Sequence, residues 1–228
     1  MKAMILAAGR GARMRPLTDH TPKPLLKVGG KPLIVWHIER LVKAGFKELV
    51  INHAHLGQQI EEALGDGAQW GARIVYSPEE TALETAGGIA NALPILGDAP
   101  FLVVNGDVFS EVNFSHLKLA LETSGLVQTK LAHLVMVDNP PQHSQGDFAL
   151  QGGMLKENGA VKLTFSGVGV YLPTLFQDVP RGEAAKLAPL LTAAMGEGLV
   201  SGEHYQGVWH DVGTPERLDA LDTFVRNQ

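Results

Sequence analysis

Residues 3–24 read AMILAAGRGARMRPLTDHTPKP, and this stretch decides the fold. The apolar run Ala3–Ala7 has the length and composition of a buried strand. It leads directly into a segment that contains two glycines, three arginines and a lysine. This order of residues is typical of a strand that feeds an anion-binding loop.

The residue types in this loop suit a phosphate ligand. Gly9 and Gly11 allow consecutive backbone N–H groups to converge on oxygen atoms with no β-carbon in the way. Arg13 is a planar, bidentate partner for phosphate, while Lys23 is a mobile point charge. Three prolines restrict the loop, so less freedom is lost when a ligand binds.

Two common phosphate loops do not fit this stretch. A dinucleotide-binding loop needs a third glycine at position 14, which is Met14. A Walker A loop needs Gly-Lys-Ser/Thr after a four-residue gap, and the stretch has none. The sequence therefore argues against a nicotinamide-dependent oxidoreductase.

The segments Leu6–Thr18 and Pro22–Pro24 resemble the signature of the sugar-phosphate nucleotidylyltransferases, LAAGxGTRLxPLT followed by PKP. Ala12 and Met14 replace the usual threonine and leucine. The resemblance implies a three-layer α/β/α Rossmann-like nucleotidyltransferase fold with a mixed, mainly parallel central sheet.

The same resemblance implies roles for particular residues. Arg13 and Lys23 would be the catalytic cations that contact the triphosphate and the reacting phosphoryl group. Nucleotide binding would involve Leu6, Ala8, Gly9, Gly11, Ala12, Arg13, Lys23, Glu79, Gly87, Gly88 and Asn105.

The chain has 228 residues, no cysteine and a formal net charge of −5. This length suits a single nucleotidyltransferase domain over residues 1–228, with a nucleotide-binding half to about residue 125 and a sugar-binding half from about 126. The net charge argues against nucleic-acid binding, and no apolar run approaches the ~20 residues of a membrane span. We expect a cytoplasmic protein without a signal peptide, a membrane association or an evident protein partner.

Alternating strands and helices follow the loop. Helical spacing of apolar residues begins at Pro32 and ends at Gly45, and a strand is expected at Glu48–Asn52. A helix near Leu56–Leu64 and a strand near Arg73–Tyr76 repeat the pattern, which predicts a parallel sheet covered on both faces.

A glycine pair, Gly87-Gly88, follows the third expected strand at the start of a helix. There a flat group could lie against the backbone, and a helix N-terminus favours an anion or a polar ligand edge. A pyrimidine with an N3–H needs an acceptor, which Glu79 or Glu80 could provide. Solvent-exposed glutamates at an ordinary helix start are an equal alternative.

Phe101–Val104 is an apolar strand that ends at Asn105 and delivers Asp107 to the carboxyl edge of the sheet. A carboxylate beside a triphosphate loop suggests a cation between them. We therefore interpret Asp107 as a ligand of Mg²⁺, the cofactor we expect, rather than as a turn residue.

The second half of the chain is less informative. Residues 164–171 resemble the family strand that lines the sugar pocket, which implies sugar binding by Gly167. We also expect sugar binding by Asp147 and Lys186. Many relatives carry a Glu-Lys-Pro whose lysine contacts the sugar phosphate, and this chain lacks it. Lys156, Lys162 or Lys186 could substitute.

Near the end, Trp209-His210-Asp211-Val212-Gly213-Thr214-Pro215 matches the family pattern WxDVGTP. The resemblance implies that Asp211 joins Asp107 on the metal. The chain ends soon after the helix that follows, so we expect a single activity.

Within the family, the compact length and residues 53–61, 137–140 and 201–205 resemble the N-acetylmuramate α-1-phosphate uridylyltransferases of cell-wall recycling. The expected substrates are UTP and this sugar-1-phosphate. The alternatives are the same chemistry on another pair, such as GTP with mannose-1-phosphate, and a non-catalytic sugar-nucleotide sensor.

Overall fold

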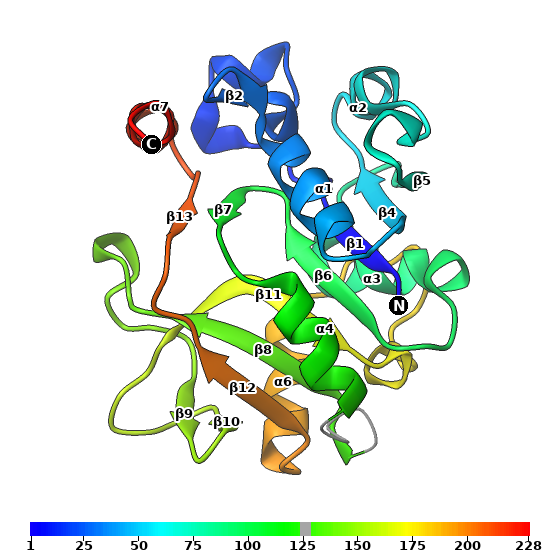
Figure 1. The fold of residues 1–228 in the computed structure, drawn as a ribbon. Coiled ribbons are helices and arrows are strands. Elements are labelled where there is room, and N and C mark those ends of the chain that lie inside the picture. The colour runs from blue at the N-terminus through cyan, green and yellow to red at the C-terminus, as the bar shows by residue number, and fades with distance from the viewer. Residues whose placement is uncertain (124–128) are drawn as a thin grey trace.

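The computed structural model describes residues 1–123 and 129–228, and its centre is a nine-stranded sheet (Figure 1). The strand order is β5-β4-β1-β6-β11-β8-β12-β10-β9. In chain order the strands of this sheet are β1 Ala3–Leu6, β4 Glu48–His53, β5 Arg73–Pro78, β6 Phe101–Asn105, β8 Ala132–Val137, β9 Ala149–Gln151, β10 Met154–Lys156, β11 Thr164–Tyr171 and β12 Val200–His204.

Most strands of this sheet run in the same direction. Strands β5, β4, β1 and β6 are parallel to one another, and β12 is parallel to β8. Strand β11 is antiparallel to β6 and β8, and β10 is antiparallel to β12 and β9. Among the nine described strands, β10 and β11 thus oppose the other seven. The predicted α/β class with a mixed, mainly parallel sheet is confirmed.

Helices cover both faces of the sheet (Figure 1). The described α-helices are α1 Leu33–Lys43, α2 Gly57–Leu64, α3 Glu84–Leu96, α4 Phe114–Thr123, α6 Leu187–Gly196 and α7 Pro215–Arg226. Helix α1 begins one residue later than expected, because Pro32 has an extended ψ of 139° and precedes the helix.

Alternation along β1 explains the layers. The side chains of Ala3 and Ile5 belong to one buried cluster, with Ile38 of α1 and Ile60 of α2. Neighbouring strand residues point to opposite faces, and Met4 accordingly belongs to a second cluster, built with α3 and α6. The expected three-layer α/β/α arrangement is therefore present.

Two small sheets extend the fold beside the carboxyl ends of the parallel strands. Strands β2 Lys27–Val28 and β3 Lys31–Pro32 form a hairpin. The C-terminal helix α7 docks on it, with a hydrogen bond from Gly29 N to Asp222 Oδ1 of 2.7 Å. Strands β7 Val108–Ser110 and β13 Trp209–Asp211 form the other sheet.

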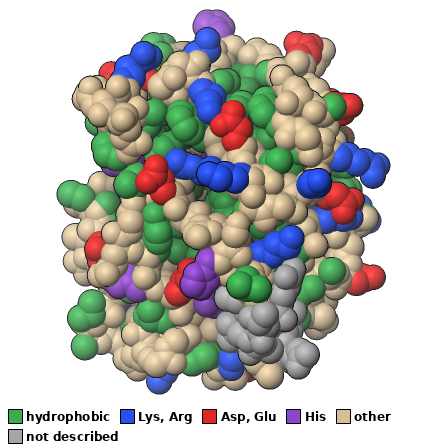
Figure 2. Space-filling model, in the orientation of Figure 1, with side chains coloured by type: hydrophobic (Ala, Val, Ile, Leu, Met, Phe, Trp, Pro, Cys, Tyr) green, Lys and Arg blue, Asp and Glu red, His purple; other side chains and the backbone are tan. Residues whose placement is uncertain are grey.

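Two expectations concern the surface and the division of the chain. No helix in the described ranges is long and apolar enough to cross a membrane. On the face in Figure 2, Lys and Arg side chains lie among Asp and Glu side chains. The expected boundary between the two halves, near residues 125 and 126, falls in 124–128, outside the described residues.

Candidate functional site

A cavity of about 410 Å³ opens at the carboxyl ends of β1, β4 and β6. This is the edge of a parallel sheet at which ligands usually bind. The cavity is large enough for much of a nucleotide. Its lining consists of Leu6, Ala7, Ala8, Gly9, Gly11, Ala12, Arg13, Met14, Lys23, Pro24, Asn52, Ala82, Glu84, Thr85, Asn105, Gly106, Asp107 and Gly213. We call it the nucleotide cavity.

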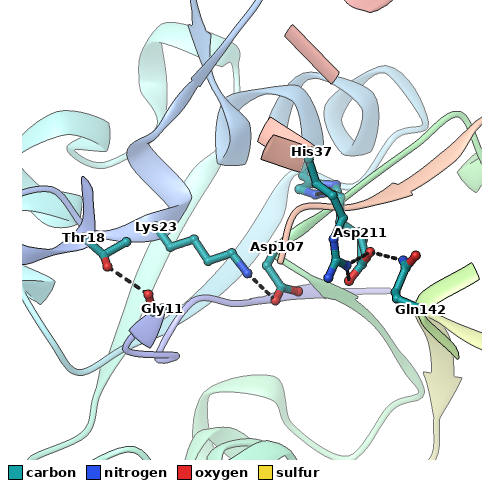
Figure 3. Close-up of polar contacts among 9 residues, drawn as sticks. Gly11, Thr18, Lys23, His37, Asp107, Gln142 and Asp211 are labelled. Carbon is teal, nitrogen blue, oxygen red and sulfur yellow. Dashed lines mark hydrogen bonds and ion pairs between the residues drawn. The ribbon is translucent and has the colours of Figure 1, made fainter. Parts of the chain in front are cut away.

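The glycine loop forms one wall of the nucleotide cavity. Gly11 has a φ of +65°, which favours glycine, and its carbonyl accepts a hydrogen bond of 2.8 Å from Thr18 Oγ1 (Figure 3). A β-carbon on Gly11 would lie 3.0 Å from Thr18 Cγ2. At Gly9 a β-carbon would meet no protein atom within 4 Å. The loop is therefore tightly folded at Gly11 and open at Gly9.

Two cationic side chains on this wall differ in burial and in pairing. Lys23 is buried, and its Nζ lies 2.8 Å from Asp107 Oδ2 (Figure 3). Arg13 belongs to a short 3-10 helix, Ala12–Met14, and its side chain is exposed. The cavity thus holds one cation already paired with a carboxylate and one open to solvent.

Asp211 reaches the same region from the end of the chain. Strand β13 pairs with β7 so that Asp211 lies opposite Val108, and Val212 N donates to Asp107 O over 2.9 Å. The Asp211 carboxylate contacts Gln142 Nε2 at 2.7 Å and also the Arg217 guanidinium (Figure 3). The fold therefore brings Asp107, in the turn directly before β7, close to Asp211 on β13, the strand that pairs with β7.

A second cavity of about 290 Å³ adjoins the first. Its lining is Asn105, Asp107, Val108, Pro140, Gln142, His143, Asp147, Thr164, Phe165, Ser166, Gly167, Trp209 and Asp211. Asn105 and Asp107 line both cavities. We call this one the sugar cavity, after the ligand expected there.

Two of the predicted sugar-binding residues line the sugar cavity. Asp147 contacts His143 Nε2 at 3.0 Å and accepts a hydrogen bond from Phe165 N at 2.8 Å. Gly167 has a φ of +80°, and a β-carbon there would lie 2.7 Å from Asn105 Nδ2. Lys186, the third, is exposed and precedes α6 without lining either cavity.

Three of the predicted nucleotide-binding residues do not line the nucleotide cavity. Glu79 is buried, and its two oxygens accept from Asn52 Nδ2 at 2.7 Å and Leu83 N at 2.8 Å. Gly87 and Gly88 are buried within α3. Both kinds of residue contact the protein itself, which explains why they are absent from the lining.

At the start of α3, two of the amide groups that we expected to be free are already paired. The N–H groups of Ala86 and Gly87 both donate to the carbonyl of Ala185, at 2.9 and 3.1 Å. Helix N-termini attract anions through unpaired N–H groups. These two groups are already used, so they do not offer an anion site.

Sequence reasoning missed several lining residues. Asn52 is the penultimate residue of β4, and its Oδ1 accepts a hydrogen bond of 2.9 Å from Ala7 N. A polar residue at the end of an apolar strand was a usable signal for it. Gln142 and His143 carry no such signal, because a short 3-10 helix between strands, Pro141–His143, brings them to the cavity.

A buried histidine lies behind Asp107. His37 of α1 contacts Val108 O at 2.7 Å, so its Nε2–H donates to that carbonyl (Figure 3). Burial lowers the pKa of His37 to about 4, although the hydrogen bond to Val108 opposes this shift. His37 is therefore neutral near pH 7 and adds no charge to the site.

The donor set at the junction of the cavities fits Mg²⁺. Asp107 and Asp211 offer carboxylate oxygens, and Mg²⁺ in proteins commonly takes one or two carboxylates and completes its shell with phosphate and water. No group of three or more His, Cys, Asp or Glu side chains arranged for a metal occurs among the described residues. An all-protein cage is thus absent there, and phosphate oxygens would be needed.

Comparison with known proteins agrees with this geometry. Residues 2–146 match the family model described as nucleotidyl transferase. The chain is 58% identical over 223 residues to N-acetylmuramate alpha-1-phosphate uridylyltransferase of Neisseria meningitidis serogroup B, covering 96% of this chain and 95% of that protein. It is 34% identical to the enzyme of the same name from Caulobacter vibrioides, covering 94% and 92%.

A solved structure shares the fold. A putative glucose-1-phosphate thymidylyltransferase from Bacillus anthracis, crystallised with sucrose, superposes with a TM-score of 0.87 over 100% of this chain and 96% of that one. The two sequences are 20% identical, so this likeness concerns architecture.

Proposed function

Because the chain belongs to the nucleotidyl transferase family, we propose that it transfers the uridylyl group of UTP to N-acetylmuramate α-1-phosphate and releases pyrophosphate. The product would be UDP-N-acetylmuramate. The identity of 58% to a protein of that name, across nearly the whole length of both, supports this pair of substrates. UTP is a cytoplasmic nucleotide, so we place the reaction in the cytoplasm.

The observation that best supports a transfer reaction is that the two cavities meet. Asn105 and Asp107 line both, so a nucleotide in one and a sugar phosphate in the other would meet beside these residues. A protein that only senses a sugar nucleotide would need no second aspartate at this junction. This arrangement favours catalysis over sensing.

The chemistry needs no general base. The phosphate of the sugar is already an anion, and one of its oxygens attacks the α-phosphorus of UTP. The bond from the α-phosphorus to the oxygen bridging it to the β-phosphate breaks, and that oxygen keeps the electron pair as pyrophosphate leaves. Catalysis is then mainly positioning and charge stabilisation.

The residues of the loop suit these tasks. Arg13 is exposed on the nucleotide cavity and would bind the β- and γ-phosphates of UTP, where charge accumulates as pyrophosphate leaves. Lys23 lies beside Asp107 and would contact the reacting phosphates. Gly9 leaves space for a phosphate against the backbone, because a side chain is absent there.

The two carboxylates complete the proposed site. Asp107 and Asp211 would hold Mg²⁺, which when bound would neutralise part of the phosphate charge and orient the phosphates for in-line transfer. Arg217 and Gln142 hold Asp211 from the side, and Lys23 contacts Asp107. These contacts orient both carboxylates.

The test measures pyrophosphate release with Mg²⁺ across a matrix of substrates. UTP, dTTP, CTP, GTP and ATP are each combined with the 1-phosphates of N-acetylmuramate, N-acetylglucosamine, glucose and mannose. A dominant rate for UTP with N-acetylmuramate α-1-phosphate is expected. Dominance of another pair would overturn the substrate assignment, and no release with any pair would favour the sensor.

The metal assignment is tested with Asp107→Ala and Asp211→Ala. Each variant should lose Mg²⁺-dependent turnover and keep the circular dichroism spectrum of the native protein. Asp138, which is exposed and pairs with His204 at 2.9 Å, provides the control Asp138→Ala. A near-normal rate in either of the first two variants would contradict the assignment.

A further inference from the structure

Glu84, the first residue of α3, has an unusual backbone conformation. Its φ is +60°, in the left-handed region that costs free energy for residues other than glycine. Only Leu56 shares this feature among the described non-glycine residues. Strained residues of this kind concentrate at binding sites, so the conformation of Glu84 points to a role in binding.

The surrounding contacts hold Glu84 in this conformation. Leu83, directly before it, donates its N–H to Glu79 Oε2 at 2.8 Å and accepts from Ala185 N at 3.0 Å. Ala86, two residues after Glu84, donates to Ala185 O at 2.9 Å. The backbone is fixed on both sides of Glu84, so the fold maintains a conformation that the residue itself does not favour.

The Glu84 carboxylate is available to a ligand. Glu84 is exposed and lines the nucleotide cavity, and it makes no side-chain hydrogen bond or ion pair with any residue in the described ranges. The other carboxylate of the lining, Asp107, is already 2.8 Å from Lys23. Glu84 is thus the unpaired negative charge of this cavity.

Charge determines how a nucleotide can lie between these groups. Phosphates are attracted to Arg13 and Lys23 and repelled by Glu84. A bound triphosphate would therefore lie on the side of the cations, and the uncharged nucleoside would lie toward Glu84. A carboxylate is a hydrogen-bond acceptor only, so the nucleoside must present a donor to it.

The two neighbouring glutamates cannot fill this role. Glu79 is buried, does not line the cavity, and accepts hydrogen bonds from Asn52 Nδ2 and Leu83 N within the protein. Glu80 is exposed but does not line the cavity. The sequence pattern alone points only to these two residues as acceptors for the base.

We propose that the carboxylate of Glu84 accepts a hydrogen bond from N3–H of uracil and thereby selects UTP over CTP. This assignment rests on the proposed function and names a specificity residue for it. Cytosine has a lone pair at N3, which the carboxylate repels, whereas uracil has a donor there. A hydrogen bond to a charged group is among the stronger ones, so its loss is measurable.

The experiment compares three substitutions at residue 84 with two controls. Glu84→Gly, Glu84→Ala and Glu84→Gln are purified, and binding of Mg²⁺-UTP, Mg²⁺-CTP and Mg²⁺-dUTP is measured by calorimetry together with kcat/KM. Leu56→Gly controls for relief of a positive φ away from the nucleotide cavity. Glu80→Ala controls for loss of a neighbouring carboxylate.

Glu84→Gly and Glu84→Ala should bind UTP at least about ten-fold more weakly and lose about ten-fold in the UTP/CTP ratio. Glu84→Gln should keep more of that ratio, because its amide oxygen still accepts. Glu84→Gly should also melt no lower than the native protein, because glycine tolerates a positive φ. Both control variants should keep native UTP binding and the native UTP/CTP ratio.

Three outcomes would overturn the assignment. The first is a Glu84→Ala variant with a native UTP/CTP ratio, and the second is loss of that ratio in Glu80→Ala. The third is an equal loss of UTP and CTP binding with altered preference for dUTP, which would assign the carboxylate to the ribose. A native protein that binds UTP but transfers no uridylyl group would refute the proposed function and leave this binding test intact.

Discussion

Gly9 and Gly11 lie on the nucleotide cavity, whereas Gly87 and Gly88, which also stand near the start of a helix, are buried inside α3. A β-carbon on Gly9 would meet nothing within 4 Å, but on Gly87 it would lie 2.3 Å from the carbonyl oxygen of Glu183. Gly9 leaves room for a ligand, whereas Gly87 leaves room for the protein backbone. Glycines near the starts of two helices therefore have different roles, and mutations can test this difference.

The largest effect on activity should come from a residue that lines the nucleotide cavity. Lys23→Ala removes the buried cation beside Asp107 and is expected to lower kcat/KM about 10²–10³-fold, as loss of one charge-stabilising group commonly does. Lys27→Ala, at an exposed position nearby, should have a native rate in the same pyrophosphate assay. Equal rates for the two variants would remove Lys23 from the proposed mechanism.

A pH titration tests how the buried His37 affects the stability of the protein. Burial lowers the pKa of His37 to about 4, below its ordinary value of 6.5, so the unfolded chain takes up this proton more readily than the folded one. The stabilisation that comes from keeping His37 neutral is complete above pH 6.5. The free energy of unfolding then falls by roughly 3 kcal/mol as the pH falls toward 4.

Urea unfolding between pH 7.5 and 4.5 measures this loss. His37→Leu should be less stable at pH 7 but have a shallower dependence on pH, whereas variant His20→Leu, at an exposed histidine, should keep the native slope. An unchanged slope in the His37 variant would contradict the role assigned to burial.

Alanine substitutions at Gly87 and Gly9 examine the comparison directly. Gly87→Ala forces a methyl group against backbone atoms and should lower the free energy of unfolding by about 1–3 kcal/mol. Gly9→Ala should unfold like the native protein and bind UTP more weakly, because its methyl group takes up space in the nucleotide cavity. Denaturant titration and UTP calorimetry on both variants give the answer, and a reversed pattern would show the comparison to be wrong.

The smallest effect is expected at Glu79, whose hydrogen bonds hold the buried start of α3. Glu79→Gln leaves one acceptor for two donors, Asn52 Nδ2 and Leu83 N, and should lower the free energy of unfolding by about 1 kcal/mol. If Glu79 instead contacted the base, this variant would lose the UTP/CTP preference without a change in stability. The two readings are separated by one melting curve and one binding measurement.

Much of the fold could be predicted from the sequence, because periodicity and strand ends are local properties. Strand β1 and helix α2 begin or end within a residue of the predicted bounds. The apolar run before Asn105 correctly indicated a buried strand ending at the sheet edge. Such signals depend on neighbouring residues alone.

The site was less accessible to this reasoning, because its contacts connect distant segments. Glu79 was an obvious carboxylate, but its partner Asn52 lies on another strand and already satisfies it. Glu84 gave no signal, since nothing in the sequence shows that its φ is positive. Gln142, in the 3-10 helix Pro141–His143, contacts Asp211, which lies 69 residues further along the chain.

The pairing of β13 with β7 has a consequence for how the protein is made. Asp107 and the glycine loop emerge from the ribosome early, but Asp211 joins them only when one of the last strands adds to β7. A chain interrupted before residue 211 would keep the parallel strands and Lys23 and still lack one of the two proposed metal-binding carboxylates. Activity would therefore report that synthesis had passed Asp211.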